Sequence, residues 1–323
     1  MSIDLAKIRD SLNARHDRVL VAASRDGESQ WRAFGVPDRA DAEVGSVSKG
    51  LTGLLYRDAI ERGEITEDLT LGDALDRPEA SWAGVTLGSL AQHRSGLPRL
   101  QPDGGERSQW TRTWRMWRRG ENPYGESVEE LLDLAADAPL GKPRFSYSNL
   151  GFELLGATVA RQAGLTYAQA LRTRVLEPLG MAGSYVPSKP CDLTADALAG
   201  RSRAGRLHEP WVGEAIGPAG GVRATAPDLA ALLTGLLEGT APGVSALDPT
   251  HPAQGASRIG AAWLTIAVKG HEVTWHNGMT GGFASFVGVD RAAGVGIAMV
   301  SATASGFDAV GIKALERLRK GEV

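Results

Sequence analysis

The pattern of hydrophobic positions at the start of the chain is first helical and then strand-like. Residues 3–14 place apolar side chains at the spacing of an amphipathic helix. Residues 18–23 and 29–35 are short runs around the turn Arg25-Asp26-Gly27, which predicts two short strands. Apolar residues then return to helical spacing from Val47 until Gly63.

The period of the hydrophobic pattern changes from helical to two near the C-terminus. Short turns separate four predicted strands, at residues 259–268, 272–276, 283–289 and 295–301. Because connections this short join neighbouring strands, we expect antiparallel pairing. Residues 307–318 then follow a helical period.

The middle of the chain, residues 64–254, is predicted to be mostly helical and rich in loops. Capping patterns mark three helix starts, at Ser127/Glu130, Thr166/Gln169 and Thr225/Asp228. We therefore expect an α/β (α+β) fold. Residues 1–63 and 255–323 would form an antiparallel sheet domain flanked by helices, and residues 64–254 a mostly helical inserted domain. The cleft between them is the expected ligand site.

Composition narrows the function. Hydrophobic residues make up 42% of the chain and charged residues 23%, an ordinary globular balance. The net charge of −3 predicts neither nucleic-acid nor anionic-membrane binding. Cys191 is the single cysteine, so we expect no disulfide framework and no cysteine-based metal site, and we expect no cofactor.

The remaining composition signals concern location. No run of about eighteen apolar residues occurs, so no membrane span is expected. The first twenty residues mix charged and apolar positions, unlike a signal peptide, which predicts a cytoplasmic protein. The sequence leaves the oligomeric state open.

A serine and a lysine lie three residues apart at the start of the helix predicted after the first strands. Ser46 and Lys49 would share one face of its first turn. A serine hydroxyl becomes a good nucleophile when a base lies beside it, and a helix start offers free N–H groups and a positive dipole end. The alternative is a capping serine beside a surface lysine.

Two further segments carry candidate chemistry. Tyr147 and Asn149 are two residues apart, so in an extended loop both side chains can face one substrate; the alternative is an aromatic residue before an Asn helix cap. His276 ends a predicted strand and precedes glycine-rich backbone that can approach a substrate closely. The alternative there is a hairpin turn at Asn277-Gly278.

These three elements, Ser-x-x-Lys, Tyr-x-Asn and His-x-Gly, occur in an order and at separations that identify a family resemblance. The chain resembles the penicillin-recognising serine hydrolases, which include class C β-lactamases, DD-peptidases and related serine esterases and transacylases. Further matches to the class C-like branch lie at residues 64–75, 87–98, 176–181, 218–222 and 281–283. The resemblance covers roughly residues 18–318.

The resemblance implies roles for the candidate residues. Ser46 is expected to attack a carbonyl and become acylated, with Lys49 taking or sharing its proton and Tyr147 passing a proton to the leaving group. The backbone N–H groups of Ser46 and Met279 are expected to form the oxyanion hole. Asn149 is expected to hold Lys49 and a substrate oxygen.

His276 is the departure from the β-lactamase pattern, which usually has Lys-Thr-Gly at this point. It is expected to form a hydrogen bond toward the proton path between Tyr147 and Ser46, and an imidazole is only partly charged at neutral pH. We therefore expect a serine hydrolase that cleaves an ester or amide of a small molecule. The alternatives are an acyltransferase, a β-lactamase or D-amino-acid peptidase, and a non-catalytic sensor of β-lactams or peptidoglycan.

The clearest hint about the substrate lies in residues 101–124. Trp and Arg side chains alternate there, and together they suit an acyl chain, an aromatic ring or an anion. The alternative is a helix that packs its tryptophans on the core. The expected substrate-binding residues are Trp110, Trp114, Trp117, Trp211 and Arg223.

Overall fold

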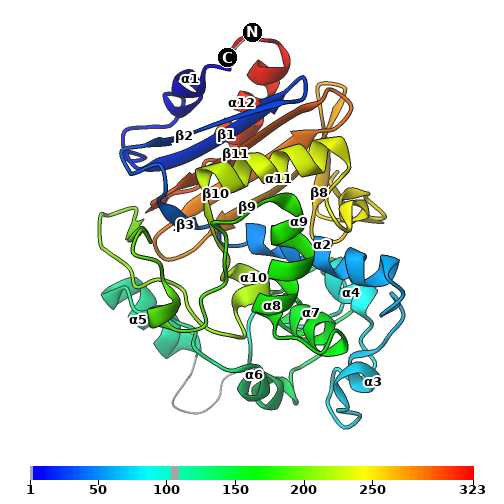
Figure 1. The fold of residues 1–323 in the computed structure, drawn as a ribbon. Helices are drawn as coiled ribbons and strands as arrows, with labels where there is room; N and C mark the ends of the chain where they lie inside the picture. The colour runs from blue at the N-terminus through cyan, green and yellow to red at the C-terminus, as the bar shows by residue number, and fades with distance from the viewer. Residues whose placement is uncertain (1–2, 103–108) are drawn as a thin grey trace.

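The computed structural model describes residues 3–102 and 109–323, and excludes the side chains of residues 109 and 110. Its main element is an eight-stranded sheet in the order β2-β1-β11-β10-β9-β8-β7-β6 (Figure 1). The strands are β1 Val19–Arg25, β2 Glu28–Phe34, β6 His251–Pro252, β7 Arg258–Ile259, β8 Leu264–Val268, β9 His271–Met279, β10 Ala284–Asp290 and β11 Val295–Ser301.

Every neighbouring pair of strands in this sheet is antiparallel, and the two chain ends meet within it. β1 pairs with β11, with Val19 opposite Ser301 and Arg25 opposite Val295. The expected fold, an antiparallel sheet built from both chain ends with flanking helices, is confirmed. Two small pairings join β3 (Asp41–Glu43) to β5 (Arg223–Thr225) and β4 (Arg201–Ser202) to β12 (Thr303–Ala304).

The continuous apolar sequence of β1 is buried on both faces of the sheet, and helices cover both faces. Val19, Val21 and Ala23 belong to one buried cluster, which includes residues of the terminal helices. Leu20 and Ala22 point to the other face and join the larger cluster that fills the rest of the molecule. Successive side chains of a strand point to opposite faces, so one short strand supplies both cores.

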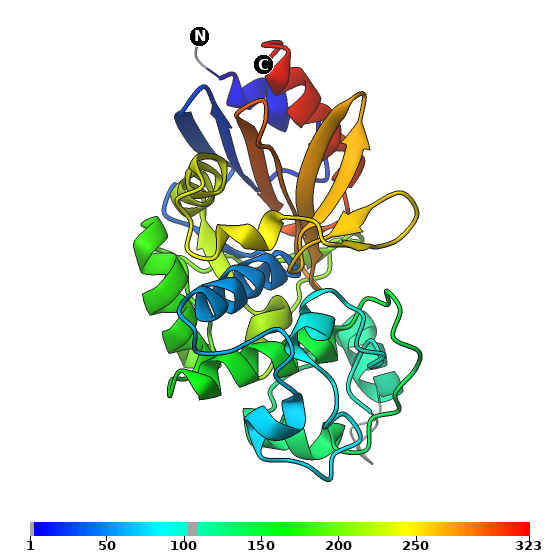
Figure 2. The same ribbon diagram turned by 90° about the vertical axis from the view of Figure 1, so that its right-hand side faces the viewer.

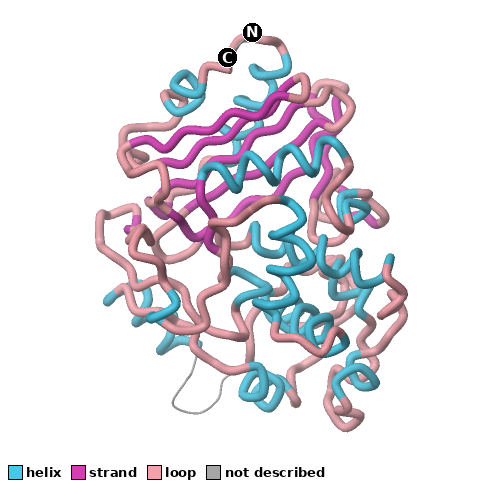
Figure 3. Tube along the Cα trace, viewed as in Figure 1, coloured by secondary structure: helices cyan, strands magenta, loops and turns pink. Residues whose placement is uncertain are grey.

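The helices form the layers on either side of this sheet and the lower half of the molecule (Figures 2 and 3). Their bounds are α1 Leu5–Arg9, α2 Val47–Glu61, α3 Leu71–Leu75, α4 Leu87–Ala91, α5 Gln109–Arg119, α6 Val128–Ala135, α7 Asn149–Gln162, α8 Tyr167–Leu171, α9 Glu177–Leu179, α10 Gly217–Gly220, α11 Ala226–Glu238 and α12 Asp308–Arg319.

Capping side chains begin several of these helices where the sequence predicted it. Ser127, Thr166 and Thr225 each accept a hydrogen bond from the backbone N–H three residues on, in complete capping boxes at α6, α8 and α11. The helix α11 lies within the range expected to be an inserted domain, yet it packs on β1, β2 and β11 of the sheet.

Two details of the predicted strands are wrong. Residues 259–268 are not one strand, because Ala262 adopts φ +70° and reverses the chain between β7 and β8. Asn277-Gly278 is not a hairpin turn, because β9 continues through both residues to Met279. The segment predicted as a helix over residues 3–14 is also shorter, since α1 ends at Arg9.

The helix α2 runs through the middle of the molecule and is buried along most of its length (Figure 2). Two of its buried polar side chains, Ser48 and Thr52, form hydrogen bonds with the backbone of the segment around α10. Ser48 Oγ accepts a hydrogen bond from the N–H of Val222 at 3.0 Å, and Thr52 Oγ1 donates to the carbonyl of Pro218 at 2.7 Å. These bonds fix the first turns of α2 against α10. Within the described residues, no helix combines the length and apolarity that a bilayer crossing requires.

A buried ion cluster joins β3 to β5. Arg223 is fully buried, pairs with Asp41, and donates a hydrogen bond to Glu43 Oε1 at 3.3 Å. The same Glu43 oxygen accepts a hydrogen bond from the backbone N–H of Trp211 at 2.9 Å. Arg223 is therefore committed to a structural pairing.

We expect Arg223→Ala to lower the free energy of unfolding by about 3–5 kcal/mol, because it leaves two buried carboxylates without their counter-charge. Urea unfolding followed by circular dichroism measures the change. The matched control is Arg203→Ala, which removes an exposed arginine and should shift the free energy by less than about 0.5 kcal/mol. Equal stability of the two variants would contradict a structural role for the cluster.

Candidate active site

The start of α2 places Ser46 beside Lys49. Ser46 occupies the N-cap position, but its side chain makes no capping hydrogen bond. Lys49 Nζ instead donates to Ser46 Oγ at 3.2 Å and to the carbonyl oxygen of Ala219. Lys49 is fully buried, so it is not a surface lysine. The hydroxyl and the amine form one hydrogen-bonded pair at the helix start.

Tyr147 lies against the same amine. Lys49 Nζ is 4.9 Å from the centroid of the Tyr147 ring, and the Arg99 guanidinium lies 5.2 Å from that centroid. The ring of Tyr147 is half-buried and lines a cavity together with Ser46. The three side chains that the sequence singled out for catalysis therefore converge, although they come from segments about a hundred residues apart in the chain.

His93 is a part of this site that the sequence did not reveal. Its ring lies 4.5 Å from the Tyr147 ring, and its Nδ1 accepts a hydrogen bond from the backbone N–H of Ser148 at 3.2 Å. Burial, aided by the nearby Lys49, holds the pKa of His93 well below its usual range, so the ring is neutral. No local sequence signal marks His93, because the rings that pack against it come from residues 145–152, distant in the chain.

His276 approaches from β9 on the other side. It is buried, and its Nδ1 is 2.7 Å from the carbonyl oxygen of Asn277, so Nδ1 carries the proton and donates. Burial, with the nearby Lys49 acting in the same direction, lowers the pKa of His276 to about 4. No hydrogen bond joins His276 to Tyr147 or Ser46 among the described contacts. His276 therefore presents a neutral ring to the cavity, with Nε2 as its acceptor.

Two glycines let the backbone of β9 approach the start of α2. Gly45 adopts φ +52°, and a Cβ on it would lie 2.9 Å from the Met279 nitrogen. A Cβ on Gly278 would lie 2.9 Å from the Ser46 nitrogen and collide with the carbonyl oxygen of Val44. The two N–H groups expected to form an oxyanion hole, those of Ser46 and Met279, are thus brought close together.

Asn149 does not make the contact expected of it. Its Oδ1 is buried and has no hydrogen-bond partner within the described part of the chain, so it does not hold Lys49. The side chain instead forms a hydrogen bond with Tyr124. Lys49 is held by a backbone carbonyl, which leaves Asn149 in the cavity wall.

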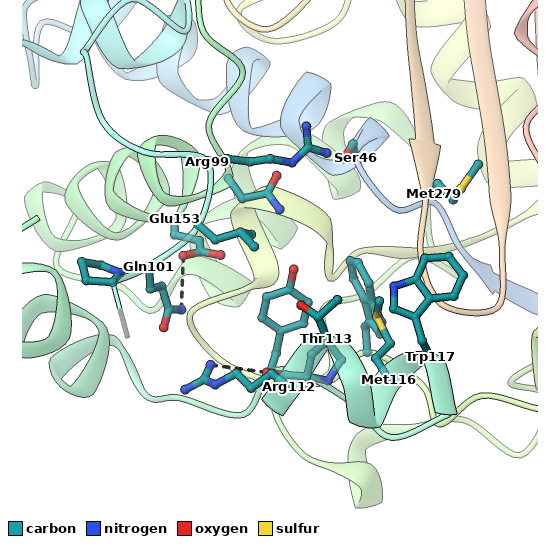
Figure 4. Close-up of a pocket in the computed structure, with 15 residues that line it drawn as sticks. Ser46, Arg99, Gln101, Arg112, Thr113, Met116, Trp117, Glu153 and Met279 are labelled. Atoms are coloured by element: carbon teal, nitrogen blue, oxygen red, sulfur yellow. Dashed lines mark hydrogen bonds between the residues drawn. The ribbon is translucent and has the colours of Figure 1, made fainter. Parts of the chain in front are cut away.

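Two cavities open on Ser46 and share Arg99 and Met279 in their walls. The larger, which we call the strand-edge cavity, has a volume of about 750 Å³ and is lined by Tyr147, His93, His276 and the edge of β9. The smaller, which we call the side chamber, has a volume of about 340 Å³. Figure 4 shows the side chamber, with Arg99 beside Ser46 and with Met116 and Trp117 on the opposite wall.

The expected substrate-binding residues divide between these surroundings. Trp117 and Trp211 line the side chamber. Trp114 is half exposed and lines neither cavity, and its ring faces Arg119 at 5.5 Å. The side chain of Trp110 lies outside the described residues. Arg223 does not bind substrate as expected, because its guanidinium pairs with carboxylates of the buried ion cluster. Its link to the side chamber is indirect: Glu43, its partner, accepts a hydrogen bond from the backbone N–H of Trp211.

Comparison with known proteins identifies the family. The sequence model of the Beta-lactamase family matches residues 8–319, and the chain belongs to this family. A β-lactamase of Escherichia coli (strain K12) is 31% identical over 152 residues, which are 46% of this chain and 36% of that protein. Penicillin-binding protein 4 of Amycolatopsis lactamdurans is 28% identical over 263 residues, 77% of this chain and 63% of that protein. The first of these matches thus spans only about a third of its relative's length.

Solved structures show the same fold. The octameric penicillin-binding protein homologue from Pyrococcus abyssi superposes with a TM-score of 0.82 at 22% identity, covering 99% of this chain and 78% of that one. The D-alanine carboxypeptidase AmpC from Burkholderia cenocepacia superposes with a TM-score of 0.79 at 21% identity, covering 99% of this chain and 100% of that one.

The protonation state of His276 gives a direct test of the electrostatics of the site. Because burial disfavours the charged ring, we expect the His276 resonances in ¹H–¹³C spectra to titrate near pH 4, and not near 6.5 as in an exposed histidine. Since the folded-state pKa is the lower one, stability from this group is present above pH 6.5 and is lost as the pH falls toward 4. Resonances assigned with His276→Gln that titrate between pH 6 and 7 would contradict the structure.

Proposed function

We propose that the protein is a serine hydrolase that cleaves an ester or amide of a small molecule through an acyl-enzyme on Ser46. One observation carries the proposal. The hydroxyl of Ser46 accepts a hydrogen bond from a buried amine, Lys49 Nζ, at the point where two cavities meet. A nucleophile and a base held this way, open to a ligand, are what acyl transfer requires.

The first half of the reaction follows from these positions. Ser46 Oγ attacks the substrate carbonyl while Lys49 accepts its proton. The oxygen of the carbonyl becomes negative and lies between the N–H groups of Ser46 and Met279, which stabilise it. The carbonyl C–O or C–N bond then breaks, and the leaving group takes a proton from Tyr147, which Lys49 returns to the phenol.

The positions of the two cavities indicate where the acyl group and the leaving group of the substrate bind. Tyr147 lines the strand-edge cavity and not the side chamber, so the leaving group that it protonates belongs in the strand-edge cavity. The acyl group then extends into the side chamber. Water entering the vacated strand-edge cavity attacks the acyl-enzyme in the second half of the reaction, with the same groups moving protons in reverse.

The size of the strand-edge cavity also favours a second candidate, an acyltransferase. Its volume of about 750 Å³ leaves room for an amine or alcohol that accepts the acyl group in place of water. Product analysis with and without candidate acceptors separates the two reactions.

The other candidates have less support. Related proteins include β-lactamases and a protein named D-alanyl-D-alanine-carboxypeptidase/endopeptidase, and β-lactam or D-amino-acid peptide turnover needs its own assay with nitrocefin and a D-Ala-D-Ala peptide. The convergence of Ser46, Lys49 and Tyr147 speaks against a non-catalytic sensor, which needs no base beside the serine.

We expect Ser46→Ala to abolish both labelling by a fluorophosphonate and turnover of p-nitrophenyl butyrate, because it removes the only atom that becomes acylated. Gel fluorescence and release of p-nitrophenol measure the two activities. The control is Ser146→Ala, which changes an exposed hydroxyl outside both cavities and should leave both signals unchanged. Labelling that persists in Ser46→Ala would disprove the proposed function.

Removal of the Tyr147 hydroxyl tests the proton path. We expect Tyr147→Phe to lower kcat for p-nitrophenyl butyrate by about 10²–10⁴-fold, as loss of a general acid–base group does. The thermal unfolding midpoint should stay the same, since no described hydrogen bond uses this hydroxyl. Tyr185→Phe is the control, because its hydroxyl bonds Asp41 outside the site and its loss affects stability and not kcat. An unchanged kcat in Tyr147→Phe would remove the phenol from the mechanism.

A further inference from the structure

The wall of the side chamber contains a carboxyl group that the proposed mechanism does not use. Glu153 lies on α7, is only 2% exposed, and lines the chamber that opens on Ser46. Gln101 Nε2 donates a hydrogen bond to Glu153 Oε2 at 3.5 Å (Figure 4). Within residues 3–102 and 109–323, Glu153 forms no ion pair. A buried acid without a cationic partner is costly unless a ligand supplies the partner.

Arg99 also lines the chamber, but it is exposed beside Ser46, 5.2 Å from the centroid of the Tyr147 ring, and is not among the groups that shift the pKa of Glu153. The two cations that do act on Glu153 are engaged elsewhere. Arg112 pairs with Glu126 at 2.5 Å and also donates to the carbonyl oxygen of Pro123. Lys49 influences Glu153 through space, but its hydrogen bonds go to Ser46 and Ala219. Arg112 offsets the charge of Glu126. Glu153 is therefore a carboxyl of the chamber wall without a cation paired to it among the described residues.

Aromatic side chains form much of the remaining wall. Tyr124 and Trp211 pack edge to face with ring centroids 4.8 Å apart, and Trp117 stands at the rim, 66% exposed. Aromatic faces attract cations, most strongly where water is excluded. A chamber that combines such faces with a buried carboxyl is suited to an ammonium group.

We propose that the side chamber binds the positively charged end of the substrate's acyl group, with Glu153 as its counter-ion and Tyr124, Trp117 and Trp211 as its walls. The proposal rests on the proposed function for its assignment of the acyl group to this chamber. It names the substrate class as esters or amides of acids that carry an ammonium group a few carbons from the carbonyl.

The protonation of Glu153 adds a pH signature. Burial raises the pKa of Glu153 to about 7, with Glu126 acting in the same direction and Gln101, Lys49 and Arg112 opposing it. The carboxylate that a cation requires therefore forms as the pH rises through 7. Between pH 6 and pH 8 the ionised fraction of such a group increases about tenfold.

Three p-nitrophenyl esters of matched length test the proposal. The acyl groups are 4-(trimethylammonio)butanoyl, its neutral isostere 5,5-dimethylhexanoyl, and the anionic 4-sulfobutanoyl. None of these acyl groups titrates between pH 6 and pH 8, so a change with pH in the ratio of kcat/KM for the cationic and neutral esters comes from the protein. Effects of pH on Ser46, Lys49 and Tyr147 act on both esters alike and cancel in this ratio. We expect this ratio to exceed about ten at pH 8 and to fall about tenfold by pH 6.

Substitution of the carboxyl supplies the decisive comparison. Glu153→Gln should abolish the preference for the cationic ester and its pH dependence, read as the ratio of kcat/KM for the two esters so that any effect on Lys49 cancels. Glu153→Asp, which keeps the charge, should retain part of the preference. The matched control is Glu129→Gln, an exposed glutamate on α6 that lines neither cavity and should leave the ratio unchanged. A ratio near one in the wild type, or a preference for the sulfonate, would overturn the proposal.

A binding measurement separates failure of this proposal from failure of the proposed function. Calorimetric titration of Ser46→Ala with butyltrimethylammonium needs no catalysis. We expect binding at pH 8 that is weakened at least about tenfold by the additional Glu153→Gln change. If the protein hydrolyses the esters but neither binds butyltrimethylammonium nor prefers the cationic ester, only the cation subsite is contradicted. If it binds the cation but hydrolyses none of the esters, only the hydrolase proposal is contradicted.

Discussion

The structure of the site depends on how one amine is buried. Lys49 Nζ is sealed from solvent, yet it has no carboxylate partner within the described residues; it contacts Ser46 Oγ, the carbonyl of Ala219 and the ring of Tyr147. A carboxylate would bind the proton of this amine firmly and stop it from acting as a base. The Ser46 hydroxyl, the Ala219 carbonyl and the face of the Tyr147 ring hold the amine in place without adding a negative charge beside it. In the proposed mechanism, α10 is therefore needed to position the base, because it supplies the carbonyl that holds Lys49.

The surrounding fold supplies these neutral contacts from distant parts of the chain. The α2–α10 contact is fixed by Ser48 and Thr52, which share α2 with Lys49. The long strand β9 brings His276 and the Met279 N–H to the same point from the C-terminal part of the sheet. β10 pairs with residues 274–279 of β9, whereas β8 pairs only with residues 271–275, so residues 276–279 form a free edge that the sheet holds in place through β10. The sheet from both chain ends thus sets the distance between nucleophile and oxyanion donors.

Much of this could be predicted from the sequence, because the strongest signals are local. Short runs around the turn at Asp26-Gly27 identified β1 and β2, and a period of two identified β10 and β11. The spacing of Ser46 and Lys49 identified the pair at the start of α2. What failed depends on tertiary contact. The backbone turn at Ala262 is unusual for a residue with a side chain, Arg223 has no local sign of its two buried partners, and Glu153 lies in an apolar helical pattern where a surface position was equally consistent.

The electrostatics of the site follow from the same constraint on Lys49. Two histidines face it, His93 and His276, and burial beside the amine lowers the pKa of both, so neither adds a charge. Burial also raises the pKa of Glu153 to about 7, although Lys49 acts to lower it. An ionised carboxyl without a partner there would stabilise the protonated form of the amine and oppose its proposed role as a base. In the proposed complex the ligand cation offsets the charge of the Glu153 carboxylate inside the chamber, so this effect on the amine is reduced. The proposed cation subsite and the proposed role of Lys49 as a base are therefore compatible within one buried site.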